Sequence, residues 1–440
     1  MRQVLLLVLA LLWPAFAHAE VLALVGGTVL DGTGGPALRN GVVVIDGERI
    51  VAVGPAGSTP IPDGATRIST EGMTVLPGLW DLQANLMRLG HGDERRWNEV
   101  YVPIADRVVM PIAARELLAA GVTSARDAGA PLFAATSVRD RIQARRIDGP
   151  TLYVSGPRLT RSSAARASAW QWAVADAADA KSKVEQLAAA GVDYVLLADV
   201  DQWSAEELLA AIDTARLHGL PVQVFVQRAT EVERALAANV DGIVGDGPAT
   251  VFPDNVVLAL RQRAAAIDRR PFAWSPAISA VMNFEALRVD PEPLDDPRLL
   301  AGAPPIIVRD VLGSLADLGR VNWYDMPATR RTSQCTKLAQ LRDAGALVLI
   351  GSNAGAPAQF HGAATAGEII AWVRECRVDP HAAIRAATLD AAFAMGVAAE
   401  NGSITPGKYA DVIAVYGDVL RQIERLTDLA VVIRHGRRYR

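Results

Sequence analysis

Residues 75–85 read VLPGLWDLQAN, and this stretch decides the fold expected for the chain. An apolar run of strand length, residues 75–79, is followed at once by polar side chains. A run that is apolar on both faces is typical of a parallel strand that is covered on both sides. In parallel barrels, chemistry takes place where the strands end. The stretch therefore predicts a buried strand whose carboxyl end lies at a functional face.

Further apolar runs of strand length follow along the chain, mostly separated by helical stretches. The runs are residues 122–126, 151–155, 194–198, 221–226, 242–245, 272–275 and 347–351. The clearest helical stretches are residues 105–120, 176–190, 205–218 and 364–373. This alternation predicts an α/β fold with a parallel sheet covered by helices. Together with the first run, the repeats predict a closed (β/α)8 TIM barrel over residues 76–404.

Both ends of the chain carry short strand patterns without helices between them. Residues 41–45 and 50–53 flank an Asp46-Gly47 hairpin signal, and residues 411–415 and 429–433 are short apolar runs near the other end. Neither end holds enough strands for a core of its own. We therefore expect residues 20–75 and 405–440 to pair into one small composite β-sandwich domain.

One connection, residues 279–330 after the seventh strand, is unusually long and rich in proline. Long connections in compact domains are often lids or binding loops. Two interpretations stay open for this insertion. It covers the pocket or docks a partner, or it is a passive addition to the barrel.

The segment at residues 75–81 resembles the amidohydrolase superfamily, in its imidazolonepropionase-like and prolidase-like branch. Residues 121–129 resemble the second strand of that family, residues 386–396 the helix after the barrel, and residues 402–412 the return into the small β domain. The resemblance thus runs along the whole chain after residue 19. It implies a metal-dependent-hydrolase type of TIM barrel and hydrolysis of C–N bonds.

The resemblance also implies a metal centre made of four histidines, a carboxylated lysine and an aspartate at the strand ends. This chain has other residues at all these positions: Gln83, Asn85, Leu196, Phe225, Gly245 and Asn353. Amides hold first-row metals poorly compared with imidazole, and an amide is no base near neutral pH. A catalytic zinc needs about three protein ligands. We therefore expect no metal and no cofactor, and expect the three amides to hydrogen-bond to one another instead.

These replacements predict a non-catalytic binding or regulatory pseudoenzyme. Its ligand is expected to be a small amide- or peptide-like molecule; a protein partner or a homo-oligomer also stays open. The alternative is a hydrolase of non-peptide or dipeptide C–N bonds. Such an enzyme works without metal, or with a single metal held by atypical ligands such as Asp246 and His361.

Other side chains with useful chemistry follow the predicted strands. Ser352, His361 and Asp246 are candidate catalytic residues, because they have the types found in nucleophilic catalysis, although no motif supports their geometry. Candidate pocket residues are His91, Arg126, Arg158, Gln227, Arg228 and Trp274. Two tryptophans, Trp170 and Trp172, lie in a loop after the third strand, where they either stack on a ligand or a partner or anchor the loop.

The first residues have the pattern of an export signal. A basic start is followed by an apolar stretch and by Ala17-His18-Ala19, which fits signal peptidase. We expect residues 1–19 to be a cleaved signal peptide, with an uncleaved anchor as the alternative, and the mature protein to be periplasmic or secreted. No later stretch is apolar for long enough to cross a membrane. The net charge of −4 without a basic stripe argues against nucleic acid as a partner.

The two cysteines, Cys335 and Cys376, lie on separate predicted helices. An oxidising compartment would allow them to pair. Pairing depends on the distance between their Cα atoms, so a disulfide and two buried thiols both stay open.

Overall fold

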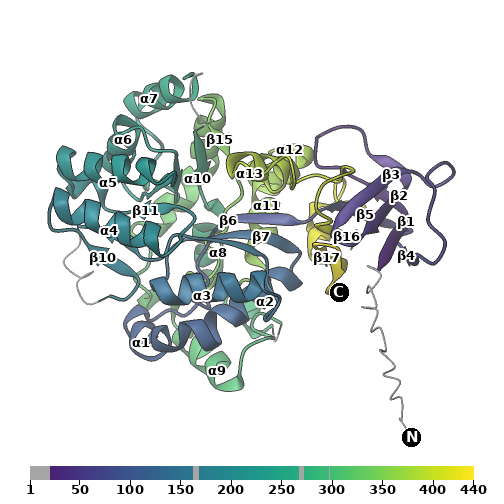
Figure 1. Ribbon diagram of the computed structural model, residues 1–440. Helices are drawn as coiled ribbons and strands as arrows, with labels where there is room; N and C mark the ends of the chain where they lie inside the picture. Colours follow the sequence, from purple (N-terminus) through teal and green to yellow (C-terminus); the bar gives the residue numbers. More distant parts are fainter. Residues whose placement is uncertain (1–19, 162–167, 267–271, 297) are drawn as a thin grey trace, which may run out of the picture.

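The computed structural model describes residues 20–161, 168–266, 272–296 and 298–440. Over these residues the chain forms a large α/β part and a smaller part made mainly of strands (Figure 1). The predicted signal peptide lies outside the described residues. Among the described helices, none combines the length and the apolar character needed to cross a membrane.

The smaller part is one sheet of eight strands from both ends of the chain, in the order β18-β17-β16-β5-β1-β2-β3, with β4 also paired to β1. Its strands are β1 Val21–Val29, β2 Leu38–Asp46, β3 Arg49–Pro55, β4 Thr66–Ser69, β5 Met73–Pro77, β16 Val412–Tyr416, β17 Leu429–Arg434 and β18 Arg437–Arg438. Because β16 lies between β5 and β17, the two ends of the chain share a continuous ladder of hydrogen bonds. Side chains from both ends also share one apolar cluster.

The stretch at residues 75–85 is divided between the two parts of the molecule. Residues up to Pro77 belong to β5, whereas β6, Leu79–Ala84, pairs with β7 of the larger part. The expectation of one strand over residues 75–79 was therefore wrong. The chain changes sheets at Gly78, where a Cβ atom would lie 2.2 Å from Oγ1 of Thr123, so that only glycine permits this close approach.

The larger part contains two parallel sheets. The first has the strands β6, β7 Val122–Asp127 and β8 Thr151–Val154. The second has the strands β10 Gln171–Ala173, β9 Arg158–Thr160, β11 Val195–Leu197, β12 Val222–Phe225, β13 Gly242–Val244, β14 Ala273–Ser275 and β15 Leu347–Val348. Each apolar run expected from residue 122 onward contains one of these strands.

Backbone hydrogen bonds connect the two parallel sheets at both of their seams. On one side, the Leu82 amide donates to the carbonyl of Ile350 at 3.0 Å, beyond the end of β15. On the other side, the Asp193 amide donates to the carbonyl of Val154 at 2.8 Å, which joins the start of β11 to β8. The carboxyl ends of the strands consequently gather at one face.

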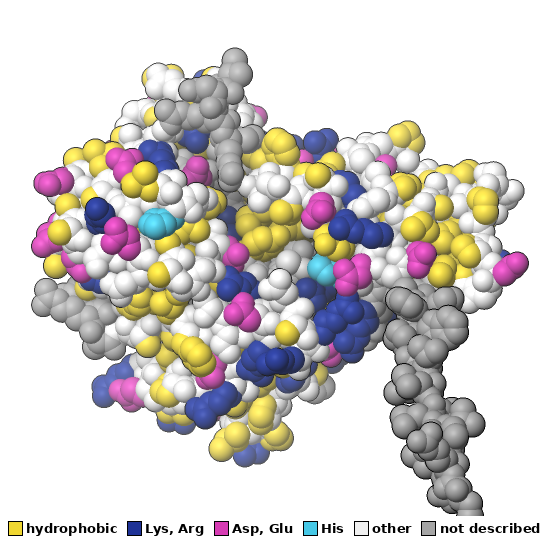
Figure 2. Space-filling model, in the orientation of Figure 1, with side chains coloured by type: hydrophobic (Ala, Val, Ile, Leu, Met, Phe, Trp, Pro, Cys, Tyr) yellow, Lys and Arg dark blue, Asp and Glu magenta, His cyan; other side chains and the backbone are white. Residues whose placement is uncertain are grey.

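Helices cover the outer faces of these strands (Figure 1). Their bounds are α1 Glu94–Val100, α2 Met110–Ala119, α3 Leu132–Gln143, α4 Ala177–Ala189, α5 Ala205–Leu217, α6 Ala229–Ala237, α7 Asp254–Ala264, α8 Ile278–Val289, α9 Pro305–Ser314, α10 Pro327–Asp343, α11 Ala364–Arg374, α12 Pro380–Ala386 and α13 Leu389–Ala394. On the face in Figure 2, acidic and basic side chains are interspersed over these helices.

A disulfide ties the late helices together. Cys335 on α10 forms a disulfide with Cys376, two residues beyond α11, with 4.8 Å between the Cα atoms. Of the two states left open for the cysteines, the structure therefore has the bonded one.

The insertion contains α8 and α9, and then returns across the face of the strand ends, where Trp323 and Tyr324 line a pocket. The insertion thus contributes part of the pocket wall.

Candidate functional site

A pocket of 280 Å³ lies at the carboxyl ends of the parallel strands. Five of the six positions that replace the expected metal ligands line it: Gln83, Asn85, Phe225, Gly245 and Asn353. The sixth, Leu196, is fully buried and packs in one cluster with Phe225 and Tyr194. Six strand-end positions that are far apart in sequence therefore meet at this face, as the resemblance implied.

The three amides satisfy one another and the neighbouring backbone. Nδ2 of Asn85 donates to Oδ1 of Asn353 at 2.9 Å and to the carbonyl of Ala354 at 3.1 Å. Oε1 of Gln83 accepts from the backbone amide of Gly245 at 2.9 Å. The expected contact among the amides is therefore found for Asn85 and Asn353, whereas Gln83 holds the end of β13.

The guanidinium of Arg158 also lines this pocket. Its Nη2 is 3.3 Å from Oδ1 of Asn85, its Nε donates to the carbonyl of Ala128 at 3.0 Å, and its Cζ lies 4.6 Å from the centre of the Phe225 ring. Burial, followed by the charge of Arg88, lowers the pKa of Arg158 to about 10, so the group stays cationic at neutral pH. A cation that belongs to the chain thus lies against two of the substituted positions, Asn85 and Phe225.

Arg158 belongs to an alternating stack of rings and guanidinium groups. Arg88 lies 4.8 Å from the Trp323 ring and 4.9 Å from the Trp170 ring. Cζ of Arg158 lies 5.3 Å from the centre of the Trp170 ring and 4.6 Å from the centre of the Phe225 ring. The order Trp323, Arg88, Trp170, Arg158, Phe225 joins the insertion to the ends of three strands. Cation–π contacts of this kind hold guanidinium groups in fixed planes.

The acidic side chains that line the pocket are engaged by other groups. Glu94 accepts from Arg88 at 2.6 Å, and Asp199 accepts from Thr160. Glu231 caps α6 and pairs with Arg228 at 2.7 Å, and burial raises its pKa to about 7.

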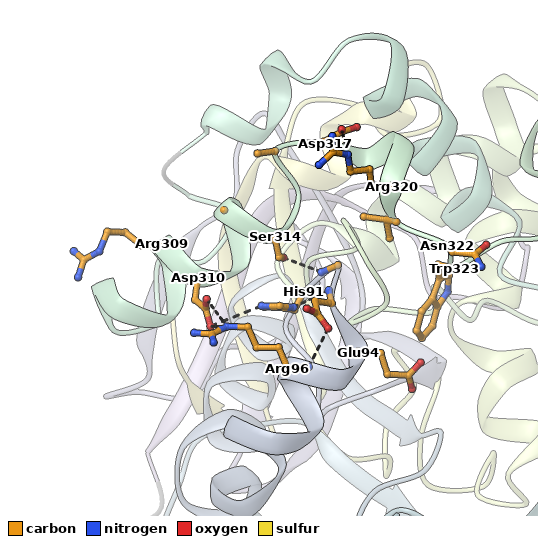
Figure 3. Close-up of a pocket in the computed structure, with 15 residues that line it drawn as sticks. His91, Glu94, Arg96, Arg309, Asp310, Ser314, Asp317, Arg320, Asn322 and Trp323 are labelled. Atoms are coloured by element: carbon orange, nitrogen blue, oxygen red, sulfur yellow. Dashed lines mark hydrogen bonds and ion pairs between the residues drawn. The ribbon is translucent and has the colours of Figure 1, made fainter. Parts of the chain in front are cut away.

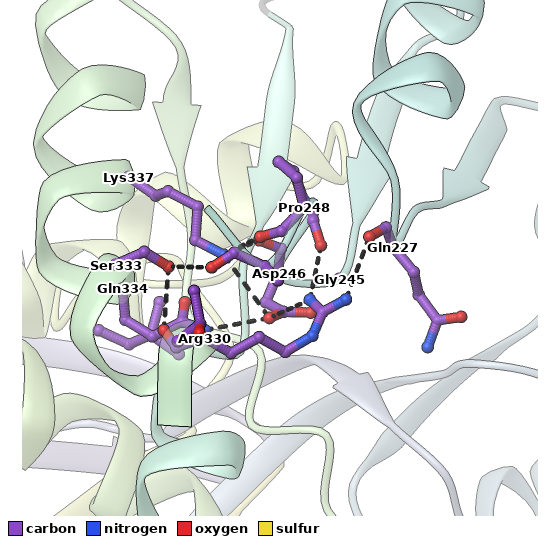
Figure 4. A network of polar contacts seen from close by, with 12 residues as sticks. Gln227, Gly245, Asp246, Pro248, Arg330, Ser333, Gln334 and Lys337 are labelled. Atoms are coloured by element: carbon purple, nitrogen blue, oxygen red, sulfur yellow. Dashed lines mark hydrogen bonds and ion pairs between the residues drawn. The ribbon is translucent and has the colours of Figure 1, made fainter. Parts of the chain in front are cut away.

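The fourth acid, Asp246, lies in a buried network between β13 and α10 (Figure 4). Its Oδ2 accepts from Arg330 at 2.8 Å and from Gln334 at 3.0 Å. Nζ of Lys337 donates to the carbonyls of Asp246 and Pro248 at 2.6 and 2.7 Å, and burial lowers the pKa of Lys337 to about 8. These contacts hold the loop after β13 against α10.

The site does not fit the metal ions that the resemblance implies. The amide oxygens of Gln83, Asn85 and Asn353 accept from Gly245, Arg158 and Asn85, respectively. The described part of the chain contains no group of three or more His, Cys, Asp or Glu that is placed to hold a metal ion. A divalent ion would also meet the positive charge of Arg158 at short range. The site therefore offers too few groups that bind metal, and its positive charge disfavours a metal cation.

The three candidate catalytic residues are separately engaged. The hydroxyl of Ser352 donates to Asp81, whose carboxylate also accepts from Thr365 at 2.7 Å. Asp246 is held by the α10 network. The ring of His361 is fully buried, next to the backbone of Asn85. No hydrogen bond joins Ser352, His361 and Asp246 in the described part of the chain.

The other candidate pocket residues are divided between the pocket and its wall. Gln227 and Arg158 line the pocket. Arg126 and Trp274 are buried behind it, where they donate to the carbonyls of Leu82 and Gly245 at 2.9 and 2.8 Å. Arg228 is absent from the lining and pairs with Asp201, among other acids.

His91 lines a second, larger groove of 740 Å³ between α1 and α9 (Figure 3). Its Nδ1 accepts from the amide of Asp93 at 2.9 Å, and burial lowers its pKa. Arg96 and Asp310, which face each other at 2.8 Å, form part of the same wall. The groove shares Glu94, Asn322 and Trp323 with the pocket, so the two cavities are neighbours.

Sequence reasoning missed Arg88, Trp323 and Tyr324 as pocket residues. Arg88 follows β6 by four residues, and the other two belong to the long insertion, so none directly ends a strand. The two adjacent aromatic residues in a proline-rich insertion, Trp323 and Tyr324, were the sequence feature that could have pointed to the pocket. Trp170, which was left open, lines the pocket and stacks on Arg88 and Arg158.

The buried His361 predicts a dependence of stability on acid. Burial lowers its pKa to about 4, against 6.5 in an unfolded chain. Its contribution to stability is complete above pH 6.5 and is lost as the pH falls toward 4. This loss amounts to about 2 kcal/mol at pH 5 for a single proton. Denaturant unfolding at pH 7.5 and 5 should show a smaller acid loss for His361→Asn than for the native chain.

This comparison separates His361 from other buried groups. Buried Glu116, Asp127 and Glu231 have pKa values raised to about 7, and they act in the opposite direction as the pH falls. Because they are present in both proteins, their effect cancels in the difference. Equal acid losses for the two proteins would contradict the role of His361.

Comparisons with known proteins agree with the α/β fold. A model of the amidohydrolase family matches residues 300–438. A 5-methylthioadenosine/S-adenosylhomocysteine deaminase of Symbiobacterium thermophilum is 34% identical over 176 residues, which cover 35% of this chain and 39% of that protein. An imidazolonepropionase of Stenotrophomonas maltophilia is 35% identical over 127 residues, which cover 28% of this chain and 29% of that protein. The chain therefore aligns with well under half of either curated relative.

Solved structures match over almost the whole length. A prolidase candidate from Bifidobacterium longum has a TM-score of 0.75 and 26% identity, with 96% of this chain and 95% of that chain covered. A Xaa-Pro dipeptidase with bound methionine has a TM-score of 0.73 and 22% identity, with coverage of 96% and 100%. The second likeness concerns the fold alone. The chain is therefore similar to the amidohydrolase family, and the proteins it resembles include an imidazolonepropionase and a prolidase candidate.

Proposed function

We propose that this protein is an exported, non-catalytic member of the amidohydrolase superfamily that binds a small amide- or peptide-like molecule in the 280 Å³ pocket. The observation that carries the proposal is the Arg158 guanidinium, which lies among the substituted positions and contacts Asn85 and Phe225. A cation that is part of the chain lies against these positions, and the residues around it are amides, a phenyl ring and glycine. The pocket keeps its depth and its polar lining.

The architecture behind this proposal is a closed barrel with a small composite β domain beside it. The backbone hydrogen bonds at Leu82 and Asp193, at the two seams, support closure of the parallel strands into one (β/α)8 barrel. The apolar cluster shared by strands from both chain ends supports a composite β domain over residues 20–75 and 405–440, built on one continuous sheet. In a closed barrel, the pocket at the carboxyl ends of the strands would lie on the face where barrels of this kind bind their ligands.

Hydrolysis needs a group that activates water, and the pocket offers no free one among its described residues. Asn353, in place of an aspartate, is no base near neutral pH. The lining acids are engaged by Arg88, Thr160, Arg228 and Arg330. The alternative of a single metal on Asp246 and His361 has little support, because Arg330 holds the first and the second is fully buried. Binding without turnover is therefore the better reading of this geometry.

Two features support export to the periplasm or the cell exterior. Residues 1–19 have the pattern of a cleaved signal peptide. The disulfide between Cys335 and Cys376 is typical of a protein that matures in an oxidising compartment. Fractionation of cells that express the full chain, with N-terminal sequencing of the product, tests cleavage before Glu20.

Metal analysis provides the direct test of the non-catalytic proposal. The purified chain should contain well under one equivalent of zinc, and neither a chelator nor added zinc should change its melting temperature. The reason is that Gln83, Asn85 and Asn353 contribute only amide groups, and their oxygens are already engaged. Elemental analysis and thermal unfolding measure both quantities. A metal-dependent amidohydrolase treated in the same way serves as the positive control.

An activity screen completes this test. The native chain, Asn353→Ala and His361→Ala should all leave N-acyl amino acids and dipeptides intact over long incubations, as followed by chromatography of the products. Turnover that disappears with a chelator and returns with zinc would overturn the proposal. Turnover without metal that is lost in either variant would favour a metal-independent hydrolase instead.

A further inference from the structure

We infer that a second cavity, separate from the pocket at the strand ends, binds a small zwitterion such as a free amino acid, with its ammonium group on Glu116 and its carboxylate at a rim of arginines. The cavity has a volume of 290 Å³ and is lined by α2, by the start of α11, by the turn Ile423–Thr427 and by residues 298–302 of the insertion. It shares no lining residue with the 280 Å³ pocket. The inference therefore goes beyond the proposed function and does not depend on it.

The acidic group of the cavity is a buried carboxylate without a full partner. Glu116 on α2 is 8% exposed, and no described group makes a hydrogen bond of good geometry to either of its carboxylate oxygens. Burial raises the pKa of Glu116 to about 7, although the backbone of Gly302 and the charge of Arg115 act in the opposite direction. A buried carboxylate with so little compensation is costly, and a cationic group of a ligand would remove part of that cost.

The rim of the cavity has the opposite charge. Arg115, Arg298 and Arg440 line it, and all three residues are exposed. Arg298 also pairs with Asp296 at 2.6 Å. Guanidinium groups offer several donors to a carboxylate, whereas their combined charge disfavours a ligand that carries only a cation. A molecule with both charges, its ammonium inward and its carboxylate outward, fits this distribution.

The walls and the volume limit the size of the molecule. The other lining residues are mainly small or apolar, and include Ala119, Ala120, Ala301, Ala366, Leu426 and Leu429. They offer apolar contacts to the carbon atoms of a ligand. A cavity of 290 Å³ lies at the lower end of the range for ligand pockets, which suits a molecule of the size of a free amino acid.

The charge state of Glu116 predicts how binding depends on pH. With a pKa of about 7, about nine-tenths of this carboxyl is ionised at pH 8 and about one-tenth at pH 6. The other charged residues that line the cavity are Arg115 from α2, Arg298 from the insertion and Arg440 after β18, and arginine does not titrate in this range. A free amino acid keeps both of its charges at the two pH values. Its affinity should therefore fall about tenfold from pH 8 to pH 6.

The experiment compares zwitterions with relatives that lack one of the two charges, on the native protein. Calorimetric titration at pH 8 uses the common free L-amino acids, β-alanine and γ-aminobutyrate, each with its N-acetyl derivative and with the amine that lacks the carboxylate. At least one zwitterion should bind. Its N-acetyl derivative should bind roughly 10- to 100-fold more weakly because the charge-assisted contact with Glu116 is lost, and its amine should also bind more weakly. The best spacing between the two charges identifies an α-amino acid or a longer one.

Three variants place the binding in this cavity. Glu116→Gln keeps the shape of the side chain and should weaken the best zwitterion by the same factor, with no remaining change between pH 8 and pH 6. Arg115→Gln combined with Arg440→Gln should reduce the preference for the zwitterion over its amine, a ratio from which any effect on Glu116 cancels. Glu185→Gln removes a negative charge at an exposed ion pair with Lys181 and should change nothing. Circular dichroism confirms that the variants fold.

The absence of binding by every zwitterion would overturn the inference, and so would binding that survives Glu116→Gln. Equal affinities for a zwitterion and its N-acetyl derivative would remove the role of the ammonium group, and equal affinities for a zwitterion and its amine would remove that of the arginines. None of these outcomes bears on the proposed function of the 280 Å³ pocket, because the two cavities have no lining residue in common.

Discussion

Replacing Asp246 with alanine is expected to lower the free energy of unfolding by about 3–5 kcal/mol, since it removes the anion beside buried Lys337 and leaves buried Arg330 only its pair with the exposed Asp325. Arg330 and Lys337 are both almost fully buried, and they lie 2.8 and 3.6 Å from the Asp246 carboxylate. Gln334 would lose its acceptor as well. Denaturant unfolding of the native chain and of the variant, followed by circular dichroism, measures this loss.

A matched surface pair shows that burial causes the effect. Asp213 pairs with Arg216 at 3.3 Å, but both side chains are largely exposed. Asp213→Ala should therefore change stability by less than about 1 kcal/mol. Asp246→Asn, which keeps an acceptor oxygen but loses the charge, should fall between the two alanine variants. A loss for Asp246→Ala as small as that for Asp213→Ala would show that the network contributes little to the fold.

Gly245→Ala is the second variant with a large expected effect, a loss of roughly 3–5 kcal/mol from backbone strain and a steric clash. Gly245 has a φ of +104°, and a Cβ atom there would lie 2.5 Å from the carbonyl oxygen of Val226. Its backbone has little freedom to move, because its amide donates to Gln83 and its carbonyl accepts from Trp274. A histidine at this position would meet the same obstacle.

The control for this variant is a glycine with open space. Gly313, on α9, has no atom within 4 Å of an added Cβ, and its φ lies outside the left-handed region. Gly313→Ala should be neutral, or stabilise by about 0.5–1 kcal/mol, because alanine favours a helix. Unfolding curves of both variants test the contrast. If Gly245→Ala were as stable as the native chain, the strand end would have room for a metal ligand after all.

The sequence predicted most of the architecture because hydrophobic periodicity is a local property. The apolar runs from residue 122 onward contain β7, β8 and β11 to β15. The strands at the two chain ends pair in one sheet, as we expected because neither end has enough strands for a core of its own. The mistake concerned residues 75–79, which change sheets at Gly78. That break depends on the close approach of Thr123, which is more than forty residues away in the chain.

The sequence predicted where the candidate site lies better than it predicted which side chains line it. The resemblance to the metal-binding motifs of the amidohydrolase family pointed to Gln83, Asn85 and Asn353, and the structure has all three in the lining of the pocket. The sequence offered no means of choosing Arg158 over Arg126, which also follows a strand but is buried in the wall. The direction of a long side chain depends on the partners that the fold supplies.

By itself, the amino-acid sequence determined the alternation of strands and helices, the pairing of the two chain ends and the replacement of six strand-end positions. The first two follow from the period of apolar residues, and the third follows from the resemblance to the amidohydrolase motifs. Only the tertiary structure decided that Cys335 bonds to Cys376, that the insertion contributes part of the pocket wall and that Arg158 lies against Asn85. Each of these depends on distances between residues far apart in the chain, and such distances are set by packing.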